Sequence, residues 1–182
     1  MKIQIRRGAF ETNSSSTHAI NIYRGSDYEI PKSIIVRPGE FGWECTTFNS
    51  PEDKLSYLYT WCASKCHIWE TNEVTGHYES HYDYKKLKDY QYRIKSKLEA
   101  LGVEEIDFET LGGWSYENGY IDHSEDLYDG DLENILENYF EDFIFNYASY
   151  IETGNDNDKM MYVKMEMQIF QYIKVINYGI NL

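Results

Sequence analysis

The chain has 182 residues with 42% hydrophobic side chains, which suffices for one domain with a sizeable core and argues against a wholly disordered chain. Its three Cys exclude a fully paired disulfide framework and favour a reducing compartment. Thirty-one Asp and Glu against seventeen Lys and Arg give a formal net charge of −14. The first residues lack the apolar run of a signal peptide, and no stretch is long and apolar enough to span a bilayer. We therefore expect a cytoplasmic protein without membrane contact.

Two short strands joined by a polar loop are predicted at the N-terminus. Residues 2–7 and 19–24 both alternate Ile with polar side chains, which is typical of strands. The polar run between them, from Phe10 to His18, is rich in side chains that bond local backbone and favour turns. A further strand is predicted over residues 34–37, where Pro38-Gly39 ends it.

Two helices are predicted in the middle of the chain. Ser50-Pro51-Glu52-Asp53 is a strong helix start, because Ser caps, Pro suits the first turn and Asp stands at the third helical position. The helix that follows has an apolar stripe of about five turns, made by Leu55, Leu58, Cys62, Cys66 and Trp69. A second helix is predicted from near Asp83 to Gly102, with a basic outer face and a buried stripe of Tyr84, Leu87, Ile94, Leu98 and Leu101.

An acidic subregion, residues 103–158, follows these helices. Residues 103–130 are predicted to be irregular, and a third helix of nearly six turns is predicted from Asp131, with a break at Gly154. Residues 159–182 fit a strand or a helix at first and become more β-like towards the end. We therefore predict a single α+β domain over residues 1–182. It has small N-terminal antiparallel strands, two or three amphipathic helices in the middle and a β-like C-terminal segment.

The distribution of charge is the main functional signal. Residues 98–158 contain eighteen of the thirty-one carboxylates and no Lys or Arg, while the segments before and after each have a net charge of +2. On the predicted third helix, Glu133, Glu137 and Glu141 project opposite the apolar stripe, about 6 Å apart along the axis. We therefore predict a partner-binding surface of nine carboxylates: Asp122, Glu125, Asp126, Asp129, Asp131, Glu133, Glu137, Glu141 and Asp142.

The partner of such a surface is expected to be a protein. A segment without cations cannot displace the counterions of nucleic acid, so direct binding of nucleic acid is excluded, and a protein with a basic nucleic-acid groove fits instead. The predicted helix alone has too low a density of negative charge to imitate DNA. Residues 131–152 span roughly 32 Å with six acids, whereas B-DNA has roughly nineteen charges over that length. The loops of residues 103–130 must add their carboxylates. Three alternatives remain: a solvated face, internal pairing with the basic face of the second helix, or negative charge that serves solubility.

Two residue sets leave a metal-dependent enzyme as an alternative. Cys62, Cys66, His77 and His81 are the residue types of a zinc site, although both Cys occupy apolar-stripe positions and their spacing fits no usual finger. The carboxylates between positions 122 and 133 suit Mg²⁺ or Ca²⁺, but they lack the spacing of an EF-hand loop and have no cation near them. Ser14 to His18 lack a hydrolase motif, and a hydrogen-bonded turn is the better interpretation. We expect no catalysis and no cofactor.

The N-terminal motif adds a resemblance. Residues 6–18 read Arg6-Arg7-Gly8-Ala9-Phe10-Glu11-Thr12-Asn13-Ser14-Ser15-Ser16-Thr17-His18 and resemble the opening of a group of phage-associated proteins from Firmicutes. Within that group, the size and acidity of the chain are similar to those of type II-A anti-CRISPR proteins, which inhibit Cas9. The motif covers under a tenth of the chain.

The resemblance implies an inhibitor in the bacterial host cell that binds the Cas9–guide RNA complex and blocks recognition or cleavage of target DNA. Cas9 holds nucleic acid in basic channels, and the predicted acidic surface would imitate DNA there. The resemblance implies no catalytic residue. A phage accessory protein that binds another basic host protein is the alternative.

Overall fold

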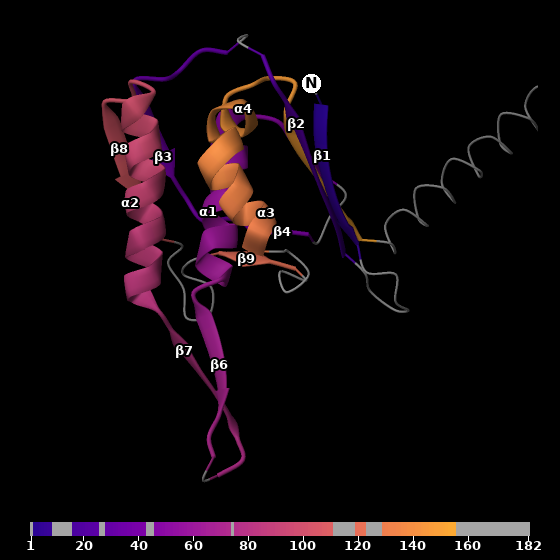
Figure 1. The fold of residues 1–182 in the computed structure, drawn as a ribbon, viewed down its shortest axis with the longest axis vertical. Coiled ribbons are helices and arrows are strands. Elements are labelled where there is room, and N and C mark those ends of the chain that lie inside the picture. Colours follow the sequence, from indigo (N-terminus) through magenta and orange to yellow (C-terminus); the bar gives the residue numbers. More distant parts are fainter. Residues whose placement is uncertain are drawn as a thin grey trace, which may run out of the picture.

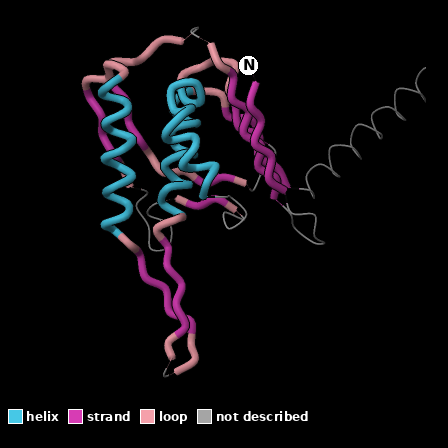
Figure 2. Tube along the Cα trace, viewed as in Figure 1, coloured by secondary structure: helices cyan, strands magenta, loops and turns pink. Residues whose placement is uncertain are grey.

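The computed structural model describes residues 2–8, 16–25, 28–42, 46–73, 75–110, 119–122 and 129–155. They form the predicted α+β fold, in which helix α1 (Pro51–Ser64) lies in the middle (Figure 1). On one side of it lies α2 (Tyr84–Ala100), and on the other lies the stretch from α3 (Asp129–Asn134) to α4 (Phe140–Ile144). A β-sheet lies beyond the α3–α4 stretch, and a β-hairpin projects from the opposite end to α4 (Figures 1 and 2). The predicted fold class is confirmed.

The main sheet is antiparallel and joins both ends of the described chain. Its strands run in the order β1 (Lys2–Gly8), β2 (Ser16–Tyr23), β10 (Tyr150–Asn155) and β5 (Thr46–Phe48). The predicted N-terminal strand pair is confirmed, with Ile5 opposite Ile20. However, β2 begins at Ser16, so Ser16, Thr17 and His18 belong to a strand and not to the predicted loop, because they pair with β1 and β10. Residues 9–15 lie outside the described residues.

His18, the last residue of the N-terminal motif, is a buried anchor. Its side chain is 4% exposed, with Nε2 2.8 Å from the carbonyl oxygen of Asp122 and Nδ1 3.1 Å from the hydroxyl of Tyr57. Because a carbonyl only accepts, Nε2 donates, and the Tyr57 hydroxyl donates to Nδ1. Thus one imidazole joins β2 to α1 and to the turn after β9 (Tyr120–Ile121). Both ring nitrogens are engaged within the core.

Helix α1 starts as predicted and ends early. The Ser50 hydroxyl accepts from the Asp53 amide at 3.1 Å, and Pro51 occupies the first turn. The predicted five turns are wrong, because the chain turns after Ser64 and enters β6 (His67–Thr71), which contains Trp69. The single apolar stripe is also wrong. Every residue from Tyr57 to Ala63 is buried, as expected for a helix that neighbours surround.

Helix α2 (Tyr84–Ala100) is confirmed at both ends. The Asp83 carboxylate accepts from the Lys86 amide at 2.9 Å, and Gly102 has a φ of +94° just after the last turn. Its buried residues are Leu87, Tyr90, Ile94 and Leu98. Tyr84 is 58% exposed and so does not belong to the buried stripe, because it lies at the helix start beyond the core.

Three pairs of short strands complete the fold. β3 (Ser33–Val36) confirms the predicted strand and pairs in parallel with β8 (Glu105–Phe108), while β4 (Glu40–Phe41) pairs in parallel with β9 (Tyr120–Ile121). The prediction that residues 103–130 are irregular is therefore wrong for β8 and β9. The third pair is the antiparallel hairpin of β6 and β7 (Tyr78–Tyr82).

The third predicted helix is shorter and less regular than expected. It consists of α3 (Asp129–Asn134), the π-helical turn η2 (Ile135–Tyr139) and α4 (Phe140–Ile144). The buried Nζ of Lys54 on α1 donates to the carbonyls of Asn146 at 2.8 Å and Ser149 at 3.0 Å. These bonds stabilise a turn after Ile144, and the chain continues into β10, which includes Gly154. Residues 159–182 lie outside the described part.

Candidate partner-binding site

The nine predicted site residues divide into three groups. Glu125 and Asp126 lie outside the described residues. Asp122 lies in the turn after β9. The other six share the α3–η2–α4 stretch, hereafter the acidic helix: Asp129, Asp131, Glu133, Glu137, Glu141 and Asp142. The structure thus brings six of the nine onto one helical element, whose Leu132, Ile135, Leu136, Phe140, Phe143 and Ile144 are buried.

Asp122 belongs to the core junction and not to an exposed surface. It is 9% exposed, and its carboxylate accepts from the Tyr120 hydroxyl at 3.0 Å. Its amide donates to the carbonyl of Phe41 at 2.8 Å, and its own carbonyl accepts from His18. Gly42 packs so tightly here that a Cβ on it would lie 2.8 Å from the Asp122 Cβ. The position of Asp122 therefore serves the packing of β4, β9 and β2.

Glu133 and Glu137 are held by one cation of α2. Arg93 Nη1 and Nη2 donate to Glu133 Oε1 and Oε2 at 3.2 and 2.5 Å, and Nη2 also donates to Glu137 Oε1 at 2.8 Å. These bonds, chiefly the one to Glu133, raise the pKa of Arg93, and the bond from Arg93 lowers the pKa of Glu137. For these two carboxylates, the alternative of internal pairing with the second helix applies.

Arg93 is also positioned by an aromatic ring. Its guanidinium carbon lies 5.6 Å from the ring centroid of Tyr90, one turn earlier on α2. The Arg93 side chain is 22% exposed, whereas those of Glu133 and Glu137 are 46% and 57% exposed. The cation is thus the more buried member of the cluster, and both carboxylates keep an open side toward solvent.

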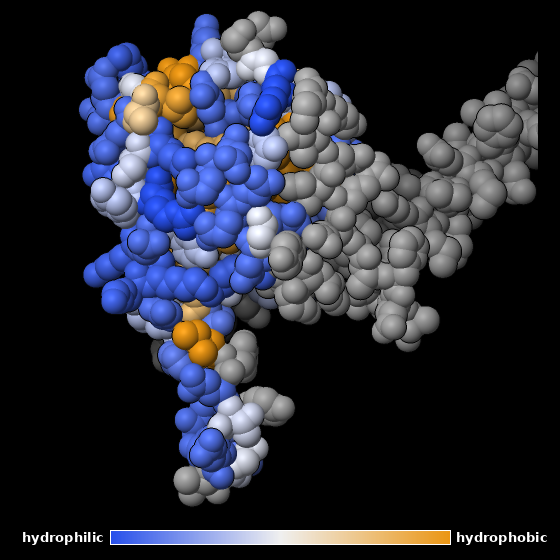
Figure 3. All heavy atoms as spheres, in the orientation of Figure 1, coloured by the Kyte–Doolittle hydropathy of each residue, from blue (hydrophilic) through white to orange (hydrophobic). Residues whose placement is uncertain are grey.

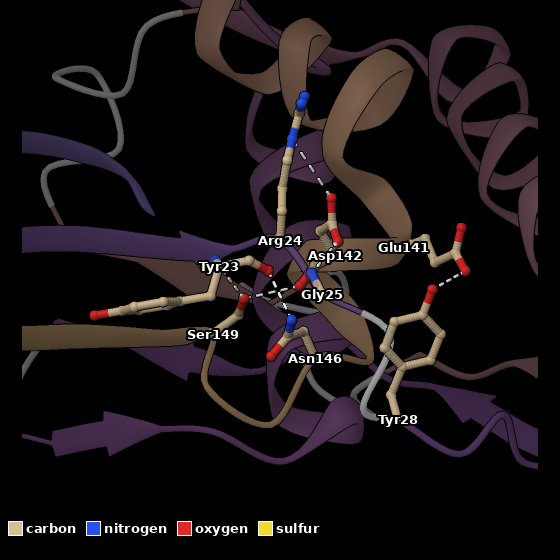
Figure 4. A network of polar contacts seen from close by, with 8 residues as sticks. All are labelled: Tyr23, Arg24, Gly25, Tyr28, Glu141, Asp142, Asn146 and Ser149. Atoms are coloured by element: carbon tan, nitrogen blue, oxygen red, sulfur yellow. Dashed lines mark hydrogen bonds and ion pairs between the residues drawn. The ribbon is translucent and has the colours of Figure 1, made fainter. Parts of the chain in front are cut away.

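Glu141 and Asp142 face a second network at the end of β2 (Figure 4). The Tyr28 hydroxyl donates to Glu141, which raises the pKa of Tyr28 to about 12. Arg24 Nε lies 3.8 Å from Asp142 Oδ2, and its guanidinium lies over the ring of Tyr139. The hydroxyl of Ser149 donates to the Asp142 carbonyl at 2.8 Å and accepts from the Tyr23 amide at 2.9 Å. This network fastens α4 to β2.

The π-helical turn explains why these carboxylates do not form one row. A π-helical turn holds more residues than an α-helical turn, so positions four apart across it do not stack as they do in an α-helix. Glu133 and Glu137 consequently meet Arg93 on α2, whereas Glu141 meets Tyr28. The regular ridge predicted from four-residue spacing is therefore split between two neighbours.

The remaining two carboxylates lie at the start of the acidic helix. Asp129 Oδ1 is 2.9 Å from Lys65 Nζ, and Asp131 is half-buried. The ion pairs described above join three cations, Lys65, Arg93 and Arg24, to four of the six carboxylates on this helix, namely Asp129, Glu133, Glu137 and Asp142. Lys97 also lies close enough to Glu137 to help lower its pKa. The charge of the acidic helix is therefore partly neutralised by neighbouring cations.

The carboxylates in β8 and on either side of it do not extend this surface. Glu104 pairs with Lys32 and Glu109 with Arg37, while Glu105 and Asp107 are exposed. β8 lies beside β3 and α2, on the other side of α2 from the acidic helix (Figure 1). The acids of residues 104–109 thus form a separate patch, and they do not supply the extra density that the prediction required.

The zinc alternative is not assembled in the described residues. Cys62 and Cys66 are buried in the core, and the Cys66 thiol lies 3.3 Å from the carbonyl of Cys62. Burial raises the pKa of both thiols, that of Cys66 to about 11, which disfavours the thiolate that zinc needs. His77 and His81 are exposed in the β6–β7 segment. Across the residues that the structure describes, no three His, Cys, Asp or Glu side chains form a group suited to a metal ion.

Pairing with the basic face of the second helix is one of the alternatives predicted from the sequence, but neither Arg93 nor Tyr28 is singled out there as a partner of the acidic helix. Arg93 lies one residue from buried Ile94 and three from buried Tyr90. A cation at the border of a buried stripe is well placed to reach a neighbouring helix. The position of Arg93 in the sequence could therefore have indicated its contact with the acidic helix. No sequence signal indicated the contact of Tyr28 with Glu141, because the two residues are 113 positions apart.

Comparisons with protein-family models, with curated proteins and with solved structures gave no match to this chain. Among the described helices, none combines the length and the apolar composition that crossing a bilayer requires.

Proposed function

We propose that this chain is a non-enzymatic inhibitor that acts in the bacterial cytoplasm by binding the Cas9–guide RNA complex. In this proposal the acidic helix lies in a basic channel of the complex and prevents target DNA from entering it. The binding residues are Asp129, Asp131, Glu133, Glu137, Glu141 and Asp142, with Glu125 and Asp126 from the preceding segment.

One observation carries the proposal: six carboxylates share a packed helical element, and several of them keep much of their side chain open to solvent. The side chains of Asp129 and Glu137 are 70% and 57% exposed, so a partner can reach them without unfolding the helix. A fixed excess of negative charge attracts a basic surface and orients it before contact. The resemblance of residues 6–18 directs the proposal to Cas9 among proteins with such surfaces.

The acidic helix alone does not match the charge density of DNA, so its role in binding is to occupy Arg and Lys side chains and not to copy a duplex over its whole length. A surface of this kind competes with DNA only while the channel is empty. Inhibition should therefore depend on which ligand reaches the complex first.

An order-of-addition cleavage assay tests this proposal. Purified Cas9–guide RNA complex is mixed with the protein before or after target DNA, and the cleaved fraction is measured. We expect strong inhibition when the protein is added first and little inhibition when DNA is bound first. Inhibition in neither order would overturn the proposal, and equal inhibition in both orders would overturn competition for the DNA channel.

A further inference from the structure

The β6–β7 hairpin is an acidic ribbon. Between His67 and Tyr82 the chain has three Glu and no Lys or Arg. Glu70 lies directly opposite Glu79 in the strand register, and Glu73 is exposed in the connection. Like charges that face each other across a hairpin destabilise it. A cationic surface laid against this pair would remove that repulsion.

The hairpin stands away from the rest of the fold. It projects beyond the lower ends of α1 and α2, and the visible face of the projection is mainly hydrophilic apart from one apolar area near its base (Figures 1 and 3). Within the described residues, β6 pairs with β7 and with no other strand. An isolated two-stranded hairpin is only marginally stable in water. A two-stranded ribbon that pairs with no third strand among the described residues is therefore suited to binding another surface.

A surface of opposite charge lies on α2 of the same chain. Tyr84, Lys88, Tyr92 and Lys95 recur at three- and four-residue steps, with Lys85 beside them, and all five are exposed. Tyr84 and Tyr92 are 58% and 70% exposed, which is unusual for large aromatic rings. Lys85 and Lys88 make no ion pair within the described part of the chain. Asp89 and Glu99 border this basic–aromatic stripe, and Glu99 lies 3.8 Å from Lys95.

The dimensions of the two surfaces agree. A strand of five residues spans roughly 17 Å, and the eleven-residue step from Tyr84 to Lys95 spans roughly 16 Å of helix. The three carboxylates of the hairpin thus equal in number the three Lys of the stripe, Lys85, Lys88 and Lys95. Exposed Tyr rings beside the Lys provide apolar contact for the ribbon and are favoured in protein interfaces.

We propose that two copies of this chain associate as a two-fold symmetric dimer in which the β6–β7 hairpin of each copy lies on the α2 stripe of the other. Only Asp83 separates β7 from α2, and the hairpin continues downward from the start of the helix (Figure 1). A two-fold axis near Asp83 therefore places each hairpin alongside the other copy's α2. Both contacts form at once, as an isologous interface requires.

A charge-exchange experiment by sedimentation equilibrium tests this dimer. At low salt, wild type should sediment with twice the chain mass of 21.6 kDa, and the mass should fall toward one chain as salt is raised. K85E/K88E reverses the stripe and E70K/E79K reverses the hairpin, so each variant alone should be monomeric. A one-to-one mixture of the two variants should recover the dimer, because each hairpin then meets a stripe of opposite charge.

Combining all four substitutions in one chain should also recover the dimer, and it keeps the net charge of −14. The control E29K/E40K changes the net charge as much as E70K/E79K does, at exposed sites elsewhere in the chain, and should stay dimeric. Circular dichroism melts confirm that each variant is folded. A monomeric wild type at every concentration, a dimeric K85E/K88E, or a mixture that stays monomeric would each overturn the proposal. Inhibition of Cas9 is measured separately, so its failure is distinct from failure of the dimer.

Discussion

Arg93 on α2 binds Glu133 on α3 through both carboxylate oxygens, with its Nη2 2.5 Å from Glu133 Oε2. The same guanidinium reaches Glu137 one turn later, so a single cation joins the basic helix to the acidic helix. The most acidic segment of the sequence is thus attached to the fold through charge as well as through its buried apolar face.

Removal of this cation should destabilise the fold moderately. Arg93→Gln should lower the free energy of unfolding by about 1–2 kcal/mol, since it removes charge-assisted bonds that are partly open to solvent. Arg93→Lys should recover part of the loss, because an ammonium group cannot bond both oxygens of Glu133 with the same geometry. Urea unfolding measures both. A double-mutant cycle with Glu133→Gln should show coupling, and additive losses would contradict the contact.

His18 should be a structural residue. His18→Ala removes the hydrogen bonds that the imidazole makes with the Asp122 carbonyl and the Tyr57 hydroxyl in the core, and we expect a loss of about 2–4 kcal/mol in unfolding free energy. Tyr57→Phe removes only one of these bonds and should cost about 1–2 kcal/mol. Thermal melts of both variants provide the comparison. If His18→Ala had the same melting temperature as wild type, the imidazole would not be an anchor.

Lys54 should make stability depend on pH. Burial lowers its pKa from 10.5 to about 8 in the folded state. Between these two values the unfolded chain binds more protons, so this contribution raises stability as pH increases from about 8 toward 10.5 and is smallest below pH 8. Wild type should gain about 1–2 kcal/mol relative to Lys54→Met between pH 7.5 and 9.5, by urea unfolding. The buried thiols, whose pKa is raised, lower stability as pH increases. Because both proteins contain these thiols, their effect cancels in the comparison with Lys54→Met.

Two glycines with positive φ should respond differently to substitution. Gly119 has a φ of +79°, and a Cβ there would lie 2.5 Å from the carbonyl oxygen of Gly39. Gly76, in the turn of the hairpin, has a φ of +68° and open space around it. Gly119→Ala should therefore cost more than about 2 kcal/mol, from backbone strain and a clash, while Gly76→Ala should cost about 1 kcal/mol from strain alone. Equal melting temperatures would contradict this difference.

Local signals predicted the parts of the fold that are determined locally. The caps Ser50 and Asp83 marked two helix starts, and Gly102 marked one helix end, because capping depends on side chains within a few residues. Alternation of Ile with polar residues marked the N-terminal strands. Each of these features rests on neighbours in sequence.

Contacts between residues far apart in the sequence determine the features that were not predicted, namely the end of the third helix, the strand β8 and the cations at the candidate site. The third helix was predicted to run to residue 152, but Lys54, which is more than ninety residues earlier, bonds the carbonyls of Asn146 and Ser149 and stabilises a turn. The strand β8 exists because β3 pairs with it, and its own pattern reads as irregular. The candidate site shows the same division between local and long-range information. The composition of the sequence located the acidic helix, but tertiary contacts such as that of Arg93 with Glu133 determine which cations pair with its carboxylates.

The proposed acidic surface is tested most directly by two variants that change its charge in opposite directions. The quantity measured is their affinity for the Cas9–guide RNA complex. Arg93→Gln and Glu133→Gln/Glu137→Gln both remove the same ion pairs, but the first leaves the helix more negative and the second less negative. We predict that Arg93→Gln binds more tightly than wild type, and that the double variant binds more weakly, at low salt. The control Arg37→Gln, which breaks the Arg37–Glu109 ion pair next to the end of β8, should bind as wild type does. Equal affinity of the two Arg93-site variants would contradict a role of these carboxylates in binding.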